Sequence, residues 1–377
     1  MKRTILVVAG EVSGDIHAGN LLVELRRVRP EIEAFGIGGD RLLAAGQEQV
    51  ATISELAHMG LVEVLRELPR IRRLMHRLVA ESEHRRPQLA VLVDSPDFNL
   101  RLAARLQALG IPVVLYVSPQ LWAWRKRRVR TVRRLAEEVL CILPFEVPFY
   151  ESHGMRARYV GHPLVDEIER LGLLAQPTEP VAGRLALLPG SRGMEVRHLL
   201  PAMLQALAHL PTDQVSDAVL VEGPGMAEEI GAVLSSCEPD SRLRRVSGEN
   251  RASALAGASL AWTASGTATL ECALLQVPMV VGYRLQPISY AIARLLVRVP
   301  NVALVNLIAG STIVPELLQR NWEPGELAAI SRGLLASDCA DQRAGLATVR
   351  ERLGGSGASL RAAEAVAEHL DNKNQST

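Results

Sequence analysis

Short, continuous runs of aliphatic residues alternate with longer segments of helical periodicity along almost the whole chain. In the first half, the runs that predict strands are Thr4–Ala9, Ala34–Ile37, Leu89–Val93, Val113–Val117, Glu138–Ile142 and Arg158–Val160. In the second half they are Leu185–Leu188, Ala218–Val221, Leu260–Trp262 and Met279–Val281. Because polar residues do not alternate within these runs, we expect strands buried on both faces, as in parallel sheets covered by helices. The order of strands and helices therefore predicts a doubly wound α/β fold.

The chain of 377 residues is long enough for two such lobes. Leu171 to Gly183 lacks helical or strand periodicity and contains Pro177 and Pro180, which favours a hinge at this place. We therefore expect an N-terminal Rossmann-like lobe over residues 1–172 and a C-terminal one over residues 183–353. Residues 354–377 are expected to add a C-terminal helix and a polar tail.

The four cysteines are widely separated, without a CxxC pair or a neighbouring histidine cluster. This spacing argues against a structural zinc site and a disulfide framework, and it fits a reducing compartment. The apolar run near the N-terminus is too short for a signal peptide and is followed at once by Glu11 and Asp15. No stretch has the apolar character of a membrane span, so we expect a cytoplasmic protein.

The formal net charge of +1 conceals an uneven distribution. Residues 55–134 hold 16 Lys and Arg against 7 Asp and Glu, whereas residues 171–377 hold 17 against 20. A basic region in one half of the chain indicates an anionic partner, such as nucleic acid, a membrane surface or a phosphorylated substrate.

Two loops of the first lobe directly follow predicted strands, where doubly wound sheets place their ligands. Residues 9–15 (AGEVSGD) combine small residues with a helix start, which attracts anions, but they lack the GxGxxG fingerprint. Residues 93–99 (VDSPDFN) place Asp94 at the end of a wholly apolar strand. A carboxylate there is suited to be a general base or to cap the next helix, and for Asp97 we favour the cap. His17 is expected to be a polar residue on a helix surface.

Two basic segments of the first lobe have more than one interpretation. Residues 116–134 contain Trp122, Trp124 and a run of arginines, as nucleic-acid-binding segments and solvated helix faces both do. Because the basic run is continuous, the solvated face is favoured. Residues 59–79 place apolar side chains at helical spacing between arginines. Such a stripe is typical of a core-facing helix, but it also suits an anionic membrane surface or an acyl chain.

Two strand-to-helix loops of the second lobe have the features of a phosphate site. In residues 188–193 (LPGSRG), small residues expose N–H groups at a helix start and Arg192 can pair with a phosphate. The lysine of a P-loop NTPase is missing there. In residues 263–271 (TASGTATLE), small and hydroxyl residues offer further donors, and Glu271 lies where it could accept the hydroxyls of a ribose. The two loops together predict a nucleoside diphosphate site; the alternative for the second is a capped helix with an exposed glutamate.

In these blocks the chain resembles the lipid-A-disaccharide synthases, which are glycosyltransferases of the GT-B type. The similar blocks run in order through nearly the whole sequence: GEVSGD, MGLVEVL, DSPDFN, YVSPQLWAWR, LPFE, YVGHPL, LPGSR, SGTATLE, PMVVGYR, NLIAG and ELLQ. The resemblance implies two Rossmann-like lobes facing a central cleft. It also implies transfer of 2,3-diacylglucosamine from its UDP derivative to 2,3-diacylglucosamine 1-phosphate, which yields UDP and a β-1,6-linked disaccharide 1-phosphate in lipid A biosynthesis.

The resemblance further implies roles for individual residues. Asp94 matches the general base proposed for the acceptor 6-hydroxyl, and Glu11 and Ser13 match a loop near the reacting centre. The residues implied on the nucleotide side are Ser191, Arg192, Ser265, Gly266, Thr267, Glu271, Asn306 and Glu316. A single base predicts inversion at the anomeric carbon, with the leaving UDP stabilised by Arg192 and helix-start N–H groups and not by a metal. No cofactor is implied.

The resemblance also implies a function for residues 59–79, because the acylated substrates reside in a membrane. The residues expected to contact the membrane or acyl chains are Val64, Leu65, Leu68, Arg72, Arg73 and Arg77. We expect peripheral association with the inner membrane, and the family suggests a homodimer.

Two alternatives remain open at this stage. Another GT-B enzyme, such as a UDP-N-acetylglucosamine transferase or a UDP-sugar 2-epimerase, would need the same nucleotide site but not the basic, apolar stripe. A nucleic-acid-binding protein would use Arg125 to Arg134 and the two tryptophans, and its affinity would depend steeply on salt. That second alternative leaves the second lobe unexplained, so we expect no nucleic-acid partner.

Overall fold

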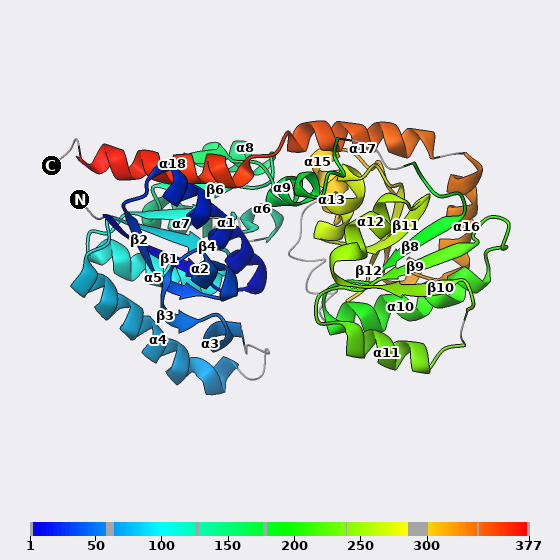
Figure 1. Ribbon diagram of the computed structural model, residues 1–377, viewed down its shortest axis with the longest axis horizontal. Helices are drawn as coiled ribbons and strands as arrows, with labels where there is room; N and C mark the ends of the chain where they lie inside the picture. Colours follow the sequence, from blue (N-terminus) through cyan, green and yellow to red (C-terminus); the bar gives the residue numbers. More distant parts are fainter. Residues whose placement is uncertain are drawn as a thin grey trace. The chain divides into compact units, whose positions relative to one another are not determined.

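The chain forms two compact units in the computed structural model, which describes residues 3–57, 64–124, 128–175, 179–238, 240–285, 301–337 and 339–374. Unit 1 consists of Met1–Asp166 and Ser356–Thr377, and unit 2 of Glu167–Gly355. Each unit is a parallel sheet between helices (Figure 1). The doubly wound α/β fold expected for both halves is confirmed.

The units do not follow the residue ranges expected from the sequence. The first change of unit falls within helix α9 (Pro163–Arg170), before the segment that the prolines and glycine mark as a hinge. That segment is anchored in unit 2, because Arg350 donates a hydrogen bond of 2.6 Å to the carbonyl oxygen of Leu174. The C-terminal helix belongs to unit 1 and is not a separate part.

Unit 1 contains a seven-stranded sheet in the order β3-β2-β1-β4-β5-β6-β7, in which every pair is parallel. The strands are β1 (Arg3–Ala9), β2 (Ile32–Gly38), β3 (Glu48–Thr52), β4 (Leu89–Val93), β5 (Val113–Tyr116), β6 (Glu138–Cys141) and β7 (Ala157–Tyr159). The helices are α1 (Val12–Val28), α2 (Asp40–Ala44), α3 (Ser54–Ala57), α4 (Val64–Arg85), α5 (Pro96–Ala108), α6 (Leu121–Trp124), α7 (Val129–Leu135), α8 (Glu146–Glu151), the first half of α9, and α18 (Ala358–Asn374).

The residues of the central strand β1 alternate between two buried layers. Ile5, Val7 and Ala9 face the layer formed by α1, α2 and α18, whereas Leu6 and Val8 face α4, α5 and α7. All five side chains are fully buried. This burial on both faces explains why the strand reads as a continuous aliphatic run.

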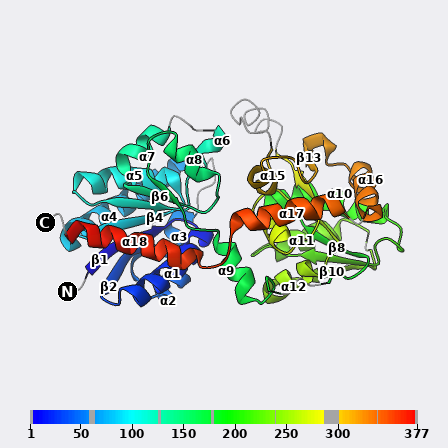
Figure 2. The same ribbon diagram turned by 90° about the horizontal axis from the view of Figure 1, so that it is seen from above.

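Helix α18 closes unit 1 although it lies about 200 residues further along the chain than the last strand of its sheet. It packs along α1 (Figures 1 and 2). The carboxylate of Asp166 accepts the backbone N–H groups of Gly357, Ala358 and Ser359 at 2.6, 3.1 and 3.1 Å. Asp166 therefore caps α18 from another helix, next to the place where the chain re-enters unit 1.

Unit 2 contains a six-stranded sheet in the order β10-β9-β8-β11-β12-β13, again with parallel pairs throughout. The strands are β8 (Arg184–Leu188), β9 (Asp217–Val221), β10 (Leu243–Val246), β11 (Leu260–Ala264), β12 (Met279–Tyr283) and β13 (Glu316–Leu318). The α-helices are α10 (Gly193–Ala208), α11 (Ala227–Ser235), α12 (Arg251–Ala256), α13 (Thr267–Leu274), α15 (Leu304–Ala309), α16 (Pro324–Ala336) and α17 (Ala340–Leu353), and the 3₁₀ turns are η2 (Gly248–Asn250) and η3 (Gln319–Asn321).

Two tryptophans anchor the core of unit 2 on the side of α10 and α16. Trp262 of β11 is fully buried, and its indole N–H donates to the hydroxyl of Ser331 at 2.8 Å. Trp322 is 1% exposed, and its indole N–H donates to the carbonyl oxygen of Leu199 at 3.1 Å. Each buried indole thus has the partner that its polar atom requires.

In the part of the chain that the structure describes, no helix is long and apolar enough to cross a membrane. The four cysteines are free thiols, and three of them, Cys141, Cys272 and Cys339, are buried.

Replacement of Asp166 by alanine should loosen α18, because three N–H groups at the helix start lose their acceptor. We expect a loss of about 1–2 kcal/mol in the free energy of unfolding of unit 1 and faster hydrogen exchange in the first turns of α18. Hydrogen-exchange mass spectrometry measures both effects. Asp341→Ala is the matched control, because Asp341 is an exposed aspartate at the start of α17. Equal exchange in the two variants would contradict the capping role.

Candidate active site

Each sheet has one point where the strand order reverses. In unit 1 it lies between β1 and β4, and in unit 2 between β8 and β11. Chains that leave neighbouring strands toward opposite faces open a crevice there, which is where doubly wound proteins bind ligands. The loops that follow these four strands are the four loops selected from the sequence, so their predicted residues lie at the switch point of each unit. Asn306 in α15 and Glu316 in β13 lie outside these loops.

Asp94 lies at the switch point of unit 1 and is next to the glycine loop. A Cβ atom on Gly14 would lie 3.5 Å from the Cβ of Asp94, so the first turn of α1 directly adjoins this aspartate. Glu11 is the N-cap residue of α1, and both Glu11 and Ser13 are exposed. The three residues expected near the reacting centre therefore gather at one edge of the sheet.

The environment of Asp94 favours proton acceptance. Its side chain is partly buried, and burial raises the pKa of the carboxyl group, while a hydrogen bond from the backbone N–H of Ser95 at 2.9 Å partly opposes this rise. A carboxylate with a raised pKa is a stronger base than an ordinary aspartate. The cap expected of Asp97 is wrong, since Ser95 is the N-cap residue of α5 and Asp97 pairs with Arg128 at 2.7 Å.

Three polar ring systems cluster beside this edge. The ring of His17 meets that of Tyr116 edge-on with centroids 6.4 Å apart. His162 is buried and close enough to His17 for the two to interact electrostatically. Burial lowers the pKa of His17 to about 4, and burial together with His17 lowers the pKa of His162 to about 3. Both imidazoles are therefore neutral at physiological pH. His17 is less exposed than predicted, since its Nδ1 and the Tyr116 hydroxyl are buried without a hydrogen-bond partner among the described residues.

Glu146, in the LPFE block, connects the loops that follow β5 and β6. It is 1% exposed, and its carboxylate accepts the indole N–H of Trp122 at 3.1 Å and the backbone N–H of Leu143 at 3.2 Å. Burial raises the pKa of Glu146 to about 7, although the bonds from Trp122 and Leu143 lower it. Glu146 is not among the residues predicted for the site, because nothing in the sequence shows that its carboxyl group is buried.

In unit 2, the expected diphosphate donors already bind a carboxylate. Glu195 accepts the backbone N–H of Ser191 at 3.1 Å and the guanidinium of Arg192 at 3.2 Å. Arg192 is 79% exposed, so its other N–H groups face solvent. The loop therefore has an affinity for a negative group, which Glu195 satisfies in this structure.

The second loop of unit 2 presents an open helix start. Gly266 is the N-cap residue of α13, and Thr267 is exposed. The hydroxyl of Ser265 donates to the carbonyl oxygen of Val302 at 3.2 Å. This bond ties the loop to the segment before α15 and leaves the hydroxyl oxygen of Ser265 with acceptor capacity.

Glu271 has a partner, Arg251, that is not predicted from the sequence. Its carboxylate, 7% exposed, receives a hydrogen bond of 2.5 Å from the guanidinium of Arg251 at the start of α12. Burial raises the pKa of Glu271, and the charge of Arg251 opposes that rise. Glu271 is thus neither exposed nor unpaired, and Arg251 joins the candidate site. The two partners are 20 positions apart in the sequence, and no spacing rule links residues at that separation.

Asn306 and Glu316 hold each other within unit 2. The amide of Asn306 is fully buried, donates to Glu316 and to the carbonyl oxygen of Val314, and accepts the N–H groups of Ile313 and Val314. Glu316 also accepts the N–H groups of Val302 and Ala303 at 2.8 and 3.0 Å. Because the carbonyl oxygen of Val302 accepts the hydroxyl of Ser265, Asn306 and Glu316 hold the segment to which the loop at the start of α13 is bonded. Their contact with a nucleotide stays a prediction.

Helix α4 carries the residues expected at a membrane. Arg72, Arg73 and Arg77 are exposed, whereas Leu74 and Leu78 are buried in the core of unit 1. The second half of the apolar stripe is therefore core. The side chains of Val64, Leu65 and Leu68 lie outside the described residues.

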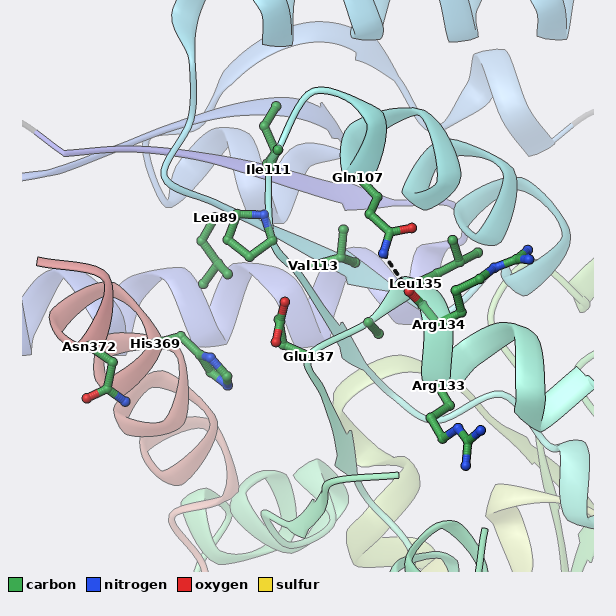
Figure 3. Close-up of a pocket in the computed structure, with 13 residues that line it drawn as sticks. Leu89, Gln107, Ile111, Val113, Arg133, Arg134, Leu135, Glu137, His369 and Asn372 are labelled. Carbon is green, nitrogen blue, oxygen red and sulfur yellow. Dashed lines mark hydrogen bonds between the residues drawn. The ribbon is translucent and has the colours of Figure 1, made fainter. Parts of the chain in front are cut away.

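A cavity of about 530 Å³ lies at the opposite edge of the sheet of unit 1 (Figure 3). It is bordered by the amino-terminal ends of β4 and β5, and His369 and Asn372 of α18 line one side. The side-chain amide of Gln107 donates to the carbonyl oxygen of Arg134 at 2.6 Å across another side. None of the residues predicted for the active site lines this cavity. Among the described residues, no group of three or more His, Cys, Asp or Glu is placed to hold a metal ion.

Comparison with known sequences gives one consistent family. A family model described as lipid-A-disaccharide synthetase matches residues 5–365. A lipid-A-disaccharide synthase from Myxococcus xanthus (strain DK1622) is 45% identical over 380 residues, covering 97% of both chains. Another from Anaeromyxobacter dehalogenans (strain 2CP-C) is 46% identical over 375 residues and 96% of both chains.

Comparison with solved structures shows the same fold at much lower identity. MurG from Acinetobacter baumannii superposes with a TM-score of 0.61 at 16% identity, covering 99% of this chain and 100% of that one. A UDP-GlcNAc 2-epimerase from Neisseria meningitidis, solved with UDP-GlcNAc bound, gives a TM-score of 0.62 at 11% identity, covering 98% and 100%. These similarities confirm the GT-B type of fold.

Replacement of Glu146 by glutamine should change how stability depends on pH. The wild-type carboxyl keeps its proton in the folded state up to about pH 7, whereas the unfolded chain loses it near pH 4.5. Between these values the folded state binds more protons, so wild-type stability falls as pH rises, by up to ~1.4 kcal/mol per unit. The glutamine of the variant cannot ionise, so the stability of the variant should lack this fall with rising pH. Its stability relative to wild type should therefore rise by about 1–3 kcal/mol from pH 5 to pH 8.

Hydrogen exchange of the β5 and β6 amides at several pH values measures how the stability of unit 1 alone depends on pH. Glu151→Gln is the control, because Glu151 is exposed on the same helix. If Glu146→Gln and wild type kept a constant difference across the range, the buried carboxyl would not be the titrating group.

Proposed function

The chain belongs to the lipid-A-disaccharide synthase family and is a glycosyltransferase of lipid A biosynthesis, and from this premise we propose its substrates and mechanism. The donor is UDP-2,3-diacylglucosamine and the acceptor is 2,3-diacylglucosamine 1-phosphate. The products are the β-1,6-linked disaccharide 1-phosphate and UDP. The observation that supports this proposal best is the pair of switch points, one with a basic carboxylate and one with phosphate-type helix starts.

Asp94 is the general base of this mechanism. It removes the proton from the acceptor 6-hydroxyl as that oxygen attacks the anomeric carbon of the donor sugar. The C–O bond to UDP breaks as the new bond forms, so the attack comes from the opposite face and inverts the anomeric centre. Partial burial and the raised pKa of Asp94 support this role. Glu11 and Ser13, on the adjoining loop, bind the acceptor near the reacting atoms.

Unit 2 binds the nucleotide. Arg192, the N–H group of Ser191 and the helix start at Ser265, Gly266 and Thr267 stabilise the diphosphate as negative charge develops on the leaving UDP. No bound metal is required in this scheme. The diphosphate replaces the carboxylate of Glu195 on the donors of the first loop, since both bear the same charge sign and need the same N–H groups.

The ribose hydroxyls bind Glu271, whose orientation is set by Arg251. Asn306 and Glu316 also belong to the nucleotide site. Glu316 holds the segment at Val302 and Ala303 in place through their N–H groups.

The acylated substrates require a membrane surface, and α4 supplies the contact. The exposed arginines Arg72, Arg73 and Arg77 bind anionic headgroups, and Val64, Leu65 and Leu68 contact acyl chains. The protein works at the cytoplasmic side of the inner membrane as a peripheral enzyme, and we expect a homodimer.

Purified protein should convert the two proposed substrates to disaccharide 1-phosphate and UDP, in EDTA and without added divalent cation. Asp94→Asn should lower kcat by about 10²–10⁴-fold, because it removes the base but keeps the shape of the side chain. Mass spectrometry of the products and UDP release measure both. Asp97→Asn is the control, since Asp97 is an exposed aspartate three residues away. Unchanged turnover by Asp94→Asn would assign the base elsewhere, and restoration by a divalent cation after EDTA would refute the metal-free scheme.

Substitution of Arg72, Arg73 and Arg77 by serine should weaken binding to vesicles that contain anionic phosphatidylglycerol. Each exposed arginine near such a surface contributes about 1 kcal/mol, and the contribution falls as salt rises. Vesicle sedimentation across a salt series measures the loss. Arg320→Ser together with Arg332→Ser removes exposed arginines from unit 2 and serves as the control. Equal binding by the triple variant and wild type at every salt concentration would remove α4 as the contact.

A further inference from the structure

The turn that carries Asp94 has a strained backbone. Asp94 and Ser95 have φ values of +55° and +42°. In the described part of the chain they are the only two consecutive non-glycine residues with a positive φ. The left-handed conformation costs a residue with a Cβ atom about 1–2 kcal/mol. Such strain persists only where surrounding contacts hold it, and it is concentrated at functional sites.

Asn99, at the end of the first turn of α5, provides these contacts. It is 1% exposed, and its side-chain amide donates to the carbonyl oxygens of Val93 at 3.1 Å and Asp94 at 2.7 Å. Its backbone N–H donates to the carbonyl oxygen of Ser95 at 3.0 Å. One residue therefore binds three successive carbonyl groups through the strained turn.

The turn is also confined from the side of β1. A Cβ atom on Gly10 would lie 2.0 Å from the Oγ and 2.4 Å from the Cβ of Ser95, so only glycine fits there. Because the carboxylate of Asp94 accepts the N–H of Ser95, the direction of the carboxylate follows the backbone of the turn. A shift of this backbone moves the carboxylate with it.

We propose that Asn99 is a positioning residue for the reaction, which fixes the strained turn and thereby aims the carboxylate of Asp94 at the acceptor hydroxyl. The proposal rests on the proposed function, in which Asp94 is the general base. A sharp, strained strand-to-helix turn presents the nucleophilic serine of α/β-hydrolases in a similar way. Only the donor side of the Asn99 amide is used for this purpose, because its Oδ1 has no hydrogen-bond partner among the described residues.

A double-mutant cycle with Asp94 tests the proposal. In the wild-type background, Asn99→Ala should lower kcat by about 10–100-fold, because a displacement of about 1 Å of a catalytic group has effects of this size. The KM for UDP-2,3-diacylglucosamine should change less than about 2-fold, since unit 2 binds the nucleotide. In the Asp94→Asn background, Asn99→Ala should lower kcat by less than about 3-fold, because there is no longer a base to aim.

A second variant keeps the test valid if Asn99→Ala does not fold. Asn99→Asp has the same shape but replaces the donating NH₂ group by an oxygen atom, so it cannot bind both carbonyl groups. Like Asn99→Ala, it should lower kcat strongly in the wild-type background and only slightly in the Asp94→Asn background. Ser95→Gly, which adopts a positive φ without steric cost, should restore part of the kcat lost in either variant.

Gln47→Ala is the matched control. Gln47 is 2% exposed, its amide donates to the carbonyl oxygen of Val7 at 2.7 Å, and its Oε1 also has no partner among the described residues. Its loss should lower stability but leave kcat within about 2-fold of wild type.

The outcomes separate the proposals. Absence of disaccharide from the wild-type protein would refute the proposed function, and full activity of Asp94→Asn would refute the base on which this inference depends. Suppose that the wild-type protein makes disaccharide and that Asp94→Asn is impaired. If Asn99→Ala then lowers kcat by the same factor in the two backgrounds, Asn99 has a structural role only, and the positioning role alone is overturned.

Discussion

The candidate active site depends on the reversal of strand order in each sheet. Consecutive chains leave β1 and β4 toward opposite faces, as they do from β8 and β11, so no crossover helix covers the edge between them. The residues that follow these strands are therefore the ones that can meet a substrate. This constraint comes from the backbone topology, which selects the four loops. The sequence then places Asp94 in one loop of unit 1 and phosphate-type residues in both loops of unit 2.

The predicted ligand-binding groups have partners within the protein in this structure. Glu195 binds the donors of the first phosphate loop, and Arg251 binds the carboxylate of Glu271. A loop of exposed N–H groups beside an arginine attracts any carboxylate that can reach it, and a buried carboxylate requires a cation or several donors. In the proposed function, substrate binding exchanges one set of charge pairs for another, so that the net gain in free energy is smaller than the number of contacts suggests.

The sequence predicts the interior of both sheets well and their edges poorly. All ten expected strands are present, but β3, β10 and β13 were missed, and all three lie at sheet edges. An edge strand has one neighbour and a more exposed side, so it does not need the continuous aliphatic run that identifies a central strand. The boundary between the units was also displaced, because the C-terminal helix returns to unit 1 and no local pattern records a contact with residues more than 180 positions away.

At the site, residue types were predictable and their environments were not. Asp94 and Arg192 stand out by their position after a strand, but the burial of Glu146 and the strain at Asp94 arise from long-range packing. The same strain continues along the edge, since Val117, directly after β5, also has a positive φ of +62°, which is rarely adopted by a β-branched residue. Two neighbouring strands thus end in left-handed residues on the side of the candidate active site. Hydrogen bonds hold these conformations, from Asn99 of α5 to the turn after β4 and from the N–H of Val117 to the carbonyl oxygen of Leu140 after β5. Stability of the surrounding core is therefore a condition for the geometry of the reacting groups.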